Sequence, residues 1–428
     1  MREIDLPRGW SYGQLGHSLR SLADGPFGSN LASKHYTDTG ARVVRLGNVG
    51  VGRFKDEDRA FISLERYKNF ARHVVSEGDV IIAGLGDSNN PLGRACLAPP
   101  ELGPAIVKAD CFRVRVDSDR LDARFLVHFL NSSLGEWGCK QRSRGSTRQR
   151  MNLRDVASLM ISRPGLDDQR RIADFLDAKT GILDRLVAMR GAGIGLLRQR
   201  EQALLDASID SMIEEYGTLP LRRFLSRVEQ GVSPQCDSLP AEEGEWGVLK
   251  VSAVKGGRFD GAENKRLPEE VAPHLRYEVR DRDLLITRAN TPALVGAVAV
   301  AEAPRARLML PDKIFRIEVT EDLNKNFFAL VARGSRIRGL CAAASHGTSQ
   351  SMANLKIEEI KSWPVPLAPT CVQADFVDRF EAAARANDEL VQAIATQIEL
   401  LEERRRALIT AAVTGQIDVT TAQRCLPV

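Results

Sequence analysis

Two stretches of the chain repeat hydrophobic residues every seven positions. From about residue 167 to 213, and again from about 370 to 414, apolar side chains keep this spacing over about five heptads. Heptads sustained over this length predict long helices that pair along an apolar seam. We expect the following leucine and isoleucine side chains to form that seam: Leu176, Leu183, Leu197, Leu204, Leu390, Ile394, Leu401 and Leu408.

Each of these helices needs a partner. A helix of about 45 residues is roughly 68 Å long at 1.5 Å per residue and is not stable alone in water. The other helix is the obvious partner, and antiparallel pairing would place a globular domain at each end of a spacer. Asn387 occupies a core heptad position, where it either fixes the register or marks a loose seam. Gly191, Gly193 and Gly195 weaken the first helix and predict a kink or a close crossing there.

The regions before the two helices follow a different pattern. Short β-branched runs such as RVVRL (42–46), DVIIA (79–83) and FRVRV (112–116) alternate with Gly and Pro, which is typical of strand-rich domains. We therefore predict an α+β fold with two repeated mixed α/β domains, separated by two long helices that form an antiparallel coiled coil with pseudo-two-fold symmetry. The expected segments are a first domain (1–165), a central helix (166–215), a second domain (216–369), a distal helix (370–418) and a tail (419–428).

The chain is a tandem duplication, because short segments return in the same order after about 200 residues. Six matches carry this conclusion: Gly52-Arg53-Phe54 with Gly257-Arg258-Phe259, Val75–Ile82 with Val279–Ile286, Phe112-Arg113-Val114 with Phe315-Arg316-Ile317, Gly145-Ser146-Thr147 plus Asn152-Leu153 with Gly347-Thr348-Ser349 plus Asn354-Leu355, Asp184–Val187 with Asp388–Val391, and Ile194–Leu205 with Ile398–Ile409. Six matches in order exclude chance.

Composition sets limits on the class of protein. With 428 residues, 43% of them hydrophobic and 27% charged, the chain can bury two or three ordinary cores. A net charge of +4 permits a polyanionic partner without singling one out. No apolar run reaches a membrane span of about 18 residues and the start lacks a secretory pattern, so we expect a cytoplasmic protein with no membrane contact. Seven scattered cysteines without a CxxC pair predict neither a metal site nor a disulfide framework.

Motifs for catalysis are missing from the sequence. It has no GxxxxGK[ST] phosphate loop, no HExxH and no nucleophile elbow, so nothing supports an ATPase, a metalloprotease or an esterase. Asp79 and Asp283 each precede an apolar strand, and the hydrogen bonds of a turn explain them better than a catalytic pair does.

The strongest chemical signal is a basic segment from Gly138 to Arg150 that contains no acidic residue. Long cations neutralise phosphates, and Arg and Gln also make paired contacts with guanine and adenine edges. The second copy repeats this theme more weakly, with Arg333, Arg336 and Arg338 before the polar residues. A solvated charged face is the alternative interpretation. The candidate DNA-binding residues are Lys140, Arg142, Arg144, Arg148, Gln149 and Arg150 in the first copy, and Arg288, Asn290, His346, Thr348, Ser349 and Gln350 in the second.

The chain resembles the specificity subunit of Type I restriction-modification enzymes. The resemblance rests on Gly78-Asp79-Val80-Ile81, on the Gly-Ser-Thr to Asn-Leu segment, on ISRPGLDDQRRIADFLDAKTGILDRL (161–186) and on the ending RRRALITAAVTGQIDV (404–419). It implies two target recognition domains that each bind one half of a split site in double-stranded DNA, with helices that fix the gap.

The resemblance also implies partners for a chain that is not itself an enzyme and binds no cofactor. Two methyltransferase subunits would bind it and hold S-adenosylmethionine, and restriction subunits, where present, would use ATP and Mg²⁺. We expect the subunit contact on the helices, with Gln169, Arg200 and Arg404 as candidates.

Two other hypotheses stay open. The chain could be a coiled-coil scaffold whose globular ends bind proteins, which DNA binding that weakens with added salt would contradict. It could also be a self-contained methyltransferase, which methyl transfer to DNA by the isolated chain would reveal.

Overall fold

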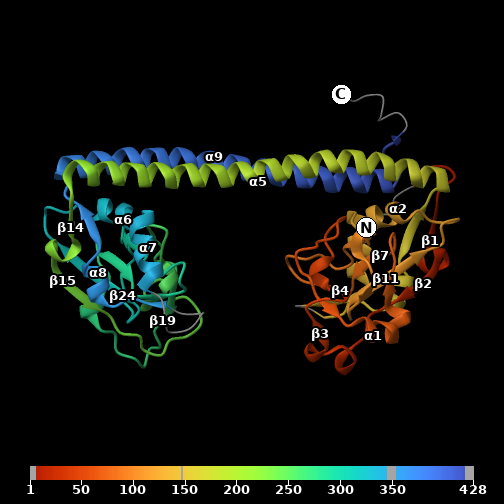
Figure 1. Cartoon of the computed structure of the whole chain (residues 1–428), viewed down its shortest axis with the longest axis horizontal. Helices are drawn as coiled ribbons and strands as arrows, with labels where there is room; N and C mark the ends of the chain where they lie inside the picture. The colour runs from red at the N-terminus through yellow and green to blue at the C-terminus, as the bar shows by residue number, and fades with distance from the viewer. Residues whose placement is uncertain (1–5, 146–147, 345–352, 420–428) are drawn as a thin grey trace. The chain divides into compact units, whose positions relative to one another are not determined.

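The computed structural model describes residues 6–145, 148–344 and 353–419 (Figure 1). Contacts divide the chain into two compact units, residues 1–191 with 395–428 and residues 192–394. Each unit therefore contains one strand-rich domain and one part of each long helix.

The first unit contains thirteen of the described strands and four short helices. Their bounds are β1 (Ser11–Gln14), β2 (Leu19–Ala23), β3 (Tyr36–Thr37), β4 (Ala41–Val44), β5 (Phe61–Ile62), β6 (Val74–Val75), β7 (Val80–Ala83), β8 (Leu85–Gly86), β9 (Ala95–Leu97), β10 (Ala105–Val107), β11 (Cys111–Val116), β12 (Gln149–Arg150), β13 (Met160–Arg163), α1 (Leu64–Tyr67), α2 (Ala123–Leu130), α3 (Ser133–Gln141) and α4 (Leu153–Ala157). An antiparallel sheet of order β2-β11-β7-β9 and a mixed sheet of order β3-β5-β4-β10-β6 form its centre.

The second unit repeats this plan. Its elements are β14 (Thr218–Pro220), β15 (Leu225–Gln230), β16 (Gly247–Leu249), β17 (Val254–Lys255), β18 (Arg258–Phe259), β19 (Asn264–Arg266), β20 (Leu284–Thr287), β21 (Ala289–Asn290), β22 (Val298–Val300), β23 (Leu308–Met309), β24 (Ile314–Val319), β25 (Ala353–Asn354), β26 (Pro364–Pro366), α6 (Lys325–Arg333), α7 (Ser335–Ala344) and α8 (Ile357–Lys361). The order β15-β24-β20-β22 matches β2-β11-β7-β9 strand for strand, and β19-β16-β23 matches β5-β4-β10. The predicted duplication and α+β architecture are confirmed.

The structure corrects one of the six sequence matches. Asn152 caps the start of α4 by accepting a hydrogen bond from the amide of Asp155 at 3.0 Å. Asn354 instead lies in β25, opposite Ala289, and α8 begins only after Lys356. The Asn-Leu pairs are thus two residues out of structural register, because the same dipeptide occurs by coincidence at two different points of the repeat.

The two long helices are α5 (Leu166–Tyr216) and α9 (Thr370–Val413). They pair antiparallel within each unit. In the first unit Arg405 pairs with Asp184 at 2.9 Å, and in the second Asn387 donates a hydrogen bond to Glu201 at 2.8 Å. Between these two contacts the residue number increases from 184 to 201 along α5 and decreases from 405 to 387 along α9, so the helices run in opposite directions. Asn387 therefore makes a polar contact across the helix pair, as a residue that fixes the register would.

The glycines of α5 do not mark a close crossing. A Cβ atom built on Gly191, Gly193 or Gly195 would meet nothing within 4 Å outside the helix itself. The expectation of a tight approach at these residues is wrong, because the surrounding space is open and the helix continues without interruption through all three.

The predicted seam is buried at only some of its positions. Leu176 and Leu183 are buried, at 0% and 8% exposed, and Leu197, Ile394, Leu401 and Leu408 are half-buried. Leu204 and Leu390 are 54% and 49% exposed, which contradicts their place in a closed seam. A strict seven-residue spacing drifts by about 20° per heptad on a straight helix, or about 80° over the 28 residues from Leu176 to Leu204. Leu205, fully buried, takes the inward position instead.

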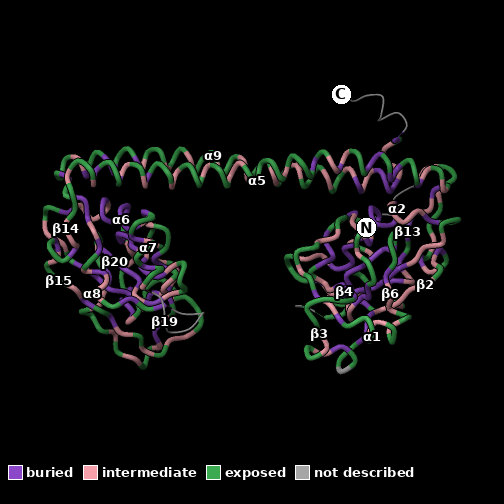
Figure 2. The backbone as a smooth tube through the Cα atoms, viewed as in Figure 1, coloured by how far each residue is buried: buried purple, intermediate pink, exposed green. Residues whose placement is uncertain are grey.

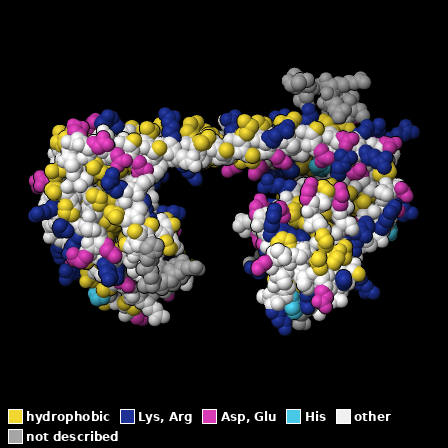
Figure 3. Space-filling view, viewed as in Figure 1, with side chains coloured by type: hydrophobic (Ala, Val, Ile, Leu, Met, Phe, Trp, Pro, Cys, Tyr) yellow, Lys and Arg dark blue, Asp and Glu magenta, His cyan; other side chains and the backbone are white. Residues whose placement is uncertain are grey.

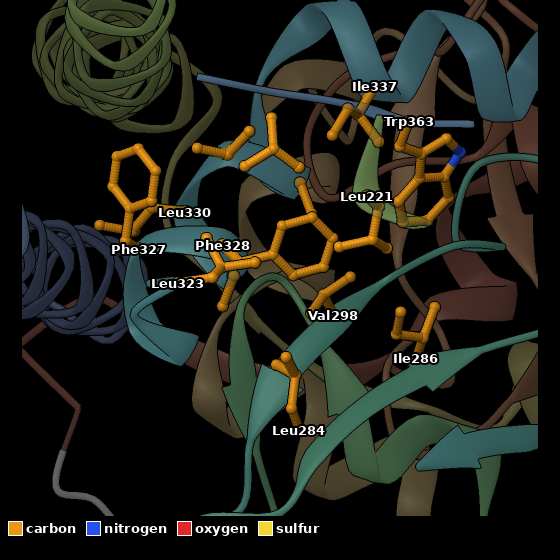
Figure 4. Packing of buried hydrophobic residues seen from close by; sticks show 14 of the residues in the cluster. Leu221, Leu284, Ile286, Val298, Leu323, Phe327, Phe328, Leu330, Ile337 and Trp363 are labelled. Atoms are coloured by element: carbon orange, nitrogen blue, oxygen red, sulfur yellow. The ribbon is translucent and has the colours of Figure 1, made fainter. Parts of the chain in front are cut away.

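The largest apolar cluster of each unit joins the long helices to the domain, and a smaller one lies between the two sheets. Buried segments accordingly run through each domain in Figure 2. In the second unit, residues of α6, β20 and β22 pack with Trp363 and with one side of α5 and α9 (Figure 4). Leu205 and Phe376 join this cluster, whereas Leu176 and Ile409 join the corresponding cluster of the first unit. Each long helix is therefore anchored at both ends by a different core.

Gln169 also belongs to this anchoring. Its side chain is 1% exposed, accepts from the amide of Asp122 at 2.8 Å and donates to the carbonyl groups of Arg120 and Pro164. Gln373 makes the same contacts in the second unit, accepting from the amide of Asn324 at 2.8 Å. The expectation that Gln169 contacts another subunit is wrong, because every polar atom of its amide is used inside the chain.

Candidate nucleic-acid interface

A short strand pair carries the basic segment of the first unit. Gln149 and Arg150 form β12, which pairs with Leu85 and Gly86 of β8. The backbones of Arg144 and Arg150 also bond to each other, in both directions at 3.0 Å. The segment therefore turns back on itself next to the edge of β8, and residues 146–147 within it lie outside the described residues. We call residues 144–150 the basic hairpin.

The cations of this segment divide into free and engaged groups. The side chains of Arg144 and Arg148 are exposed, and neither has a hydrogen-bond or ion-pair partner among the residues that the structure describes. Lys140 pairs with Glu136 at 2.6 Å on α3. Arg142 donates to the hydroxyl and carbonyl oxygens of Ser158 and to the carbonyl of Gly138. Its guanidinium holds α3 against the end of α4, so Arg144 and Arg148 remain the most available for DNA.

Arg150 is held in place by acidic and aromatic neighbours. Its guanidinium pairs with Asp110 at 2.6 Å and lies 5.8 Å from the ring centre of Phe27. Asp24 accepts from the amides of Gly25 and Asp110 at 2.7 and 3.1 Å. Burial raises the pKa of Asp24 to about 6, and the nearby Asp110 carboxylate adds to the rise. These contacts join the basic hairpin to the loop that follows β2.

The second unit builds the same strand pair from different residues. Ala289 and Asn290 of β21 pair with Asn354 and Ala353 of β25. The side-chain oxygen of Asn290 accepts from the amide of Thr291 at 2.8 Å, and its NH₂ group has no partner among the residues that the structure describes. The structure therefore brings Asn290 next to the end of the second polar segment. The candidates His346, Thr348, Ser349 and Gln350 lie outside the described residues.

Arg288 stands at the position that Gly84 holds in the first unit. The carbonyl of Arg288 accepts a hydrogen bond from the amide of Leu355, the residue after β25, at 2.8 Å. The carbonyl of Gly84 accepts one from the amide of Met151, the residue after β12, at 2.9 Å. The Arg288 guanidinium lies 5.6 Å from the ring centre of Phe315, beside the strand pair. The first unit has no room for such a side chain, since a Cβ on Gly84 would approach the ring of Phe112 to 2.4 Å.

Arg333 at the end of α6 and Arg336 and Arg338 in α7 do not gather at this site. Arg333 pairs with Glu201 at 3.0 Å, and Arg336 pairs with Asp210 at 3.2 Å, both on α5. Arg338 donates to the carbonyl groups of Ala293 and Val295. Arg333 and Arg336 therefore bind the domain to α5, and Arg338 binds a loop of the domain itself. The second basic cluster suggested by the sequence is not formed by these three side chains.

A basic and aromatic segment was missed by the sequence analysis. It is RYKNFARH (66–73), which spans the end of α1 and the 3₁₀-helix η5 (Lys68–His73). Lys68 and Arg72 are exposed and have no ion-pair partner among the described residues. In the segment 66–73 cations alternate with aromatic rings, which is a known signal for nucleic-acid contact. This signal could have identified the segment from the sequence. On the face drawn in Figure 3, basic side chains are interspersed with acidic ones.

Asp79 and Asp283 are turn residues, as predicted. Asp79 accepts from the amide of Ser76 at 2.8 Å and pairs with Arg115 at 2.7 Å. Asp283 accepts from the amide of Arg280 at 2.9 Å and pairs with Arg316 at 3.0 Å. Across the described ranges, no group of three His, Cys, Asp or Glu side chains is placed to hold a metal ion. None of the described helices is both long and apolar enough to cross a membrane.

Comparisons with known proteins agree with this geometry. Residues 51–186 match the family model of the Type I restriction modification DNA specificity domain. The chain is 32% identical over 185 residues to the Type I restriction enzyme EcoEI specificity subunit of Escherichia coli, covering 42% of this chain and 31% of that subunit. It is 22% identical over 428 residues to the EcoKI specificity subunit of Escherichia coli strain K12, covering 96% of this chain and 90% of that subunit.

A solved structure shares the fold over nearly the whole length. It comes from a study of complex assembly and conformational transition of the type I R-M system, and has a TM-score of 0.68 at 18% identity. The match covers 96% of this chain and 100% of that one. The family model reaches only the first repeat and the start of α5, and the structure supplies the second copy. Residues 51–186 therefore match the Type I restriction modification DNA specificity domain, and nearly the whole chain is similar in sequence to a Type I restriction enzyme specificity subunit.

Proposed function

We propose that this chain is the DNA-recognition subunit of a Type I restriction-modification complex, and that each repeat reads one half of a two-part site. The observation that carries the proposal is the duplicated strand pair, β8 with β12 and β21 with β25. Each pair stands at the same place in its repeat and places polar or cationic residues at a sheet edge. Arg148 and Asn290 have the donors that read guanine and adenine edges.

The modular assignment predicts that one half of the site can be damaged alone. Replacing Arg148 and Arg150 with Ala should weaken recognition of one half-site by about 1 to 3 kcal/mol for each lost base contact, and leave preference at the other half intact. Binding to DNA libraries randomised in one half at a time measures this. Equal loss of preference at both halves would contradict the assignment.

We further propose that the paired helices set the gap between the halves. Inserting one heptad into both α5 and α9 adds about 10 Å of helix, the length of about three base pairs. The methylated sites mapped in a host genome should keep their two ends and gain a longer spacer. An unchanged spacer would exclude the helices as the element that sets it.

The helices also offer a surface for the methyltransferase subunits. In the second unit, α5 and α9 border a groove of about 860 Å³ lined by apolar residues that include the exposed Leu204 and Leu390. Apolar surface left open on a helix pair marks a protein contact site. Arg200 lines the same groove, and Arg404 is exposed on α9, as expected for contacts with another subunit.

Catalysis is assigned to the partners. We place S-adenosylmethionine on two methyltransferase subunits and ATP with Mg²⁺ on restriction subunits, in the cytoplasm where the host DNA lies. Labelled methyl donor incubated with DNA should be incorporated by the co-purified complex and not by this chain alone. Incorporation by the isolated chain would instead favour a self-contained methyltransferase. Absence of DNA binding that weakens with added salt would favour a protein scaffold.

A further inference from the structure

An open pocket of about 560 Å³ lies in the first unit beside the basic hairpin. The loop after β2 forms one wall with Phe27 and Asn30, and the missed segment forms the other with Arg66, Asn69 and Phe70. The pocket adjoins the basic hairpin directly, because Phe27 lies under the guanidinium of Arg150. No acidic side chain is among the described residues that line it.

The walls of the pocket are fixed by contacts that leave its polar groups free. Arg66 donates to the carbonyl of Asn30 at 2.6 Å and lies 5.9 Å from the ring centre of Phe70, and the ring of His73 contacts the carbonyl of Asp24. A Cβ on Gly25 would meet the backbone of Lys108 at 2.1 Å, so only Gly lets the loop lie this close. The pocket is thus preorganised in the unbound chain.

The free groups match the chemistry of a nucleotide. The side-chain amides of Asn30 and Asn69 have no hydrogen-bond partner among the described residues, and an amide pairs its donor and acceptor with an adenine edge. Phe27 is 49% exposed and offers a ring on which a base can stack. Lys68 and Arg72 stand on the neighbouring turn of the same segment with exposed cations that can neutralise phosphates.

We propose that this pocket binds a nucleotide of the DNA target, with the base against Phe27, its edge at the Asn69 amide, and the flanking phosphates at Lys68 and Arg72. The inference rests on the proposed function and adds a second contact to the basic hairpin. It applies to the first repeat alone. In the second, the loop after β15 places Val232 in an apolar cluster and ties Ser233 to Asp312.

The test uses the full chain co-purified with its methyltransferase subunits and a labelled duplex that carries the mapped site. Asn69→Ala should reduce affinity for that duplex about tenfold, and the loss should vanish when one base pair of the first repeat's half-site is changed. Lys68→Gln with Arg72→Gln should lower the slope of log affinity against log salt by about 1.8, equally on specific and random DNA.

Matched controls separate this inference from the proposed function. Two variants serve as controls. Asn326→Ala changes an Asn of the second unit whose side chain has no hydrogen bond among the described residues, and Arg170→Gln changes an exposed cation of α5. Neither should change affinity or slope. If the unaltered complex shows no sequence preference, the proposed function fails. A different result overturns the pocket assignment alone. In that result the unaltered complex shows a sequence preference and Arg148→Ala weakens this preference, but the Asn69 and Lys68/Arg72 variants bind as the unaltered complex does.

Discussion

The two repeats keep the same buried arginine and give it different hydrogen-bond partners. Arg113 and Arg316 occupy the same position on the second strand of the matching sheets and are 6% and 5% exposed. In the second unit Arg316 pairs with the buried carboxylate of Glu229 at 2.6 Å and with Asp283 at 3.0 Å. In the first unit Arg113 donates to the hydroxyl of Ser21 at 2.5 Å and to the carbonyl of Arg72 at 3.2 Å.

This difference shows which features the fold requires. The sheet order and the cation at its centre are common to both repeats, whereas the acceptors around that cation have changed. Glu229 faces three arginines, Arg227, Arg276 and Arg316. Burial acts to raise the pKa of Glu229, but the hydrogen bonds from Arg316 and Arg276 outweigh it and lower the pKa below its ordinary value. The second unit therefore depends on ion pairs for the stability of its buried arginine, whereas the first unit uses neutral acceptors.

The largest expected effect tests that contrast. Glu229→Gln should destabilise the second unit by about 3 kcal/mol, because it leaves a buried guanidinium without its main counter-charge. Ser21→Ala in the first unit removes a neutral acceptor and should cost about 1 kcal/mol. Urea denaturation of each variant measures both. Glu302→Gln, which breaks an exposed pair with Arg282, is the control and should cost under about 1 kcal/mol.

The two long helices differ in their middle. α5 has Gly191, Gly193 and Gly195 where the repeat offset places Ala395, Gln397 and Glu399 in α9. Each Gly→Ala change in α5 should stabilise it by about 1 kcal/mol, because the space around all three is open. Hydrogen exchange of the α5 amides should slow by about fivefold per substitution if exchange follows local opening. The control, Ala395→Gly in α9, should act in the opposite direction by a similar amount.

The carboxylates of Asp24 and Asp87 should respond to pH with opposite signs. The pKa of Asp24 is raised from 3.8 to about 6, so its contribution to stability is present below about pH 4 and is lost as the pH rises to 6. We therefore compare the Tm of Asp24→Asn with the Tm of the unaltered chain by calorimetry at pH 4 and at pH 7. The difference, variant minus unaltered chain, should be about 2 °C larger at pH 7 than at pH 4.

Asp87 is the control for this pH dependence. Hydrogen bonds from Asn89 and Asn90 lower the pKa of Asp87, so its contribution is present above the ordinary pKa and is lost as the pH falls. Asp87→Asn should lose stability relative to the unaltered chain at pH 7 and not at pH 3. The same sign for both variants would show that general charge repulsion governs the response.

The smallest effects are expected at two ion pairs of the long helices, one between α5 and α9 and one between α9 and the second domain. Two aspartates at equivalent positions of the repeat have different partners. Asp184 pairs with Arg405 of α9, and Asp388 pairs with Arg258 of β18. Arg405 is 14% exposed and Arg258 is 75% exposed. Arg405→Ala should cost about 1 kcal/mol and Arg258→Ala a few tenths, because solvent screens the exposed pair. If chemical denaturation shows a larger loss of stability for Arg258→Ala than for Arg405→Ala, the pair of Arg258 with Asp388 is the stronger contact.

The sequence by itself determined the repeating elements. A heptad period over some 45 residues, β-branched runs between Gly and Pro, and matching segments some 200 residues apart depend on local pattern, and α5, α9 and the matched sheets follow them. The same local pattern indicated the basic hairpin, because an acid-free run of cations is visible without knowledge of its neighbours.

Tertiary structure alone decided which side chains are free. Arg142 and Arg144 look alike in the sequence, yet one is bound to Ser158 and the other is open. Gln169 looks like a surface residue and is buried, and Leu204 looks like a seam residue and is exposed. The reason is that partners come from distant segments, as Phe27 does for Arg150, and a helix face turns by about 100° with each residue.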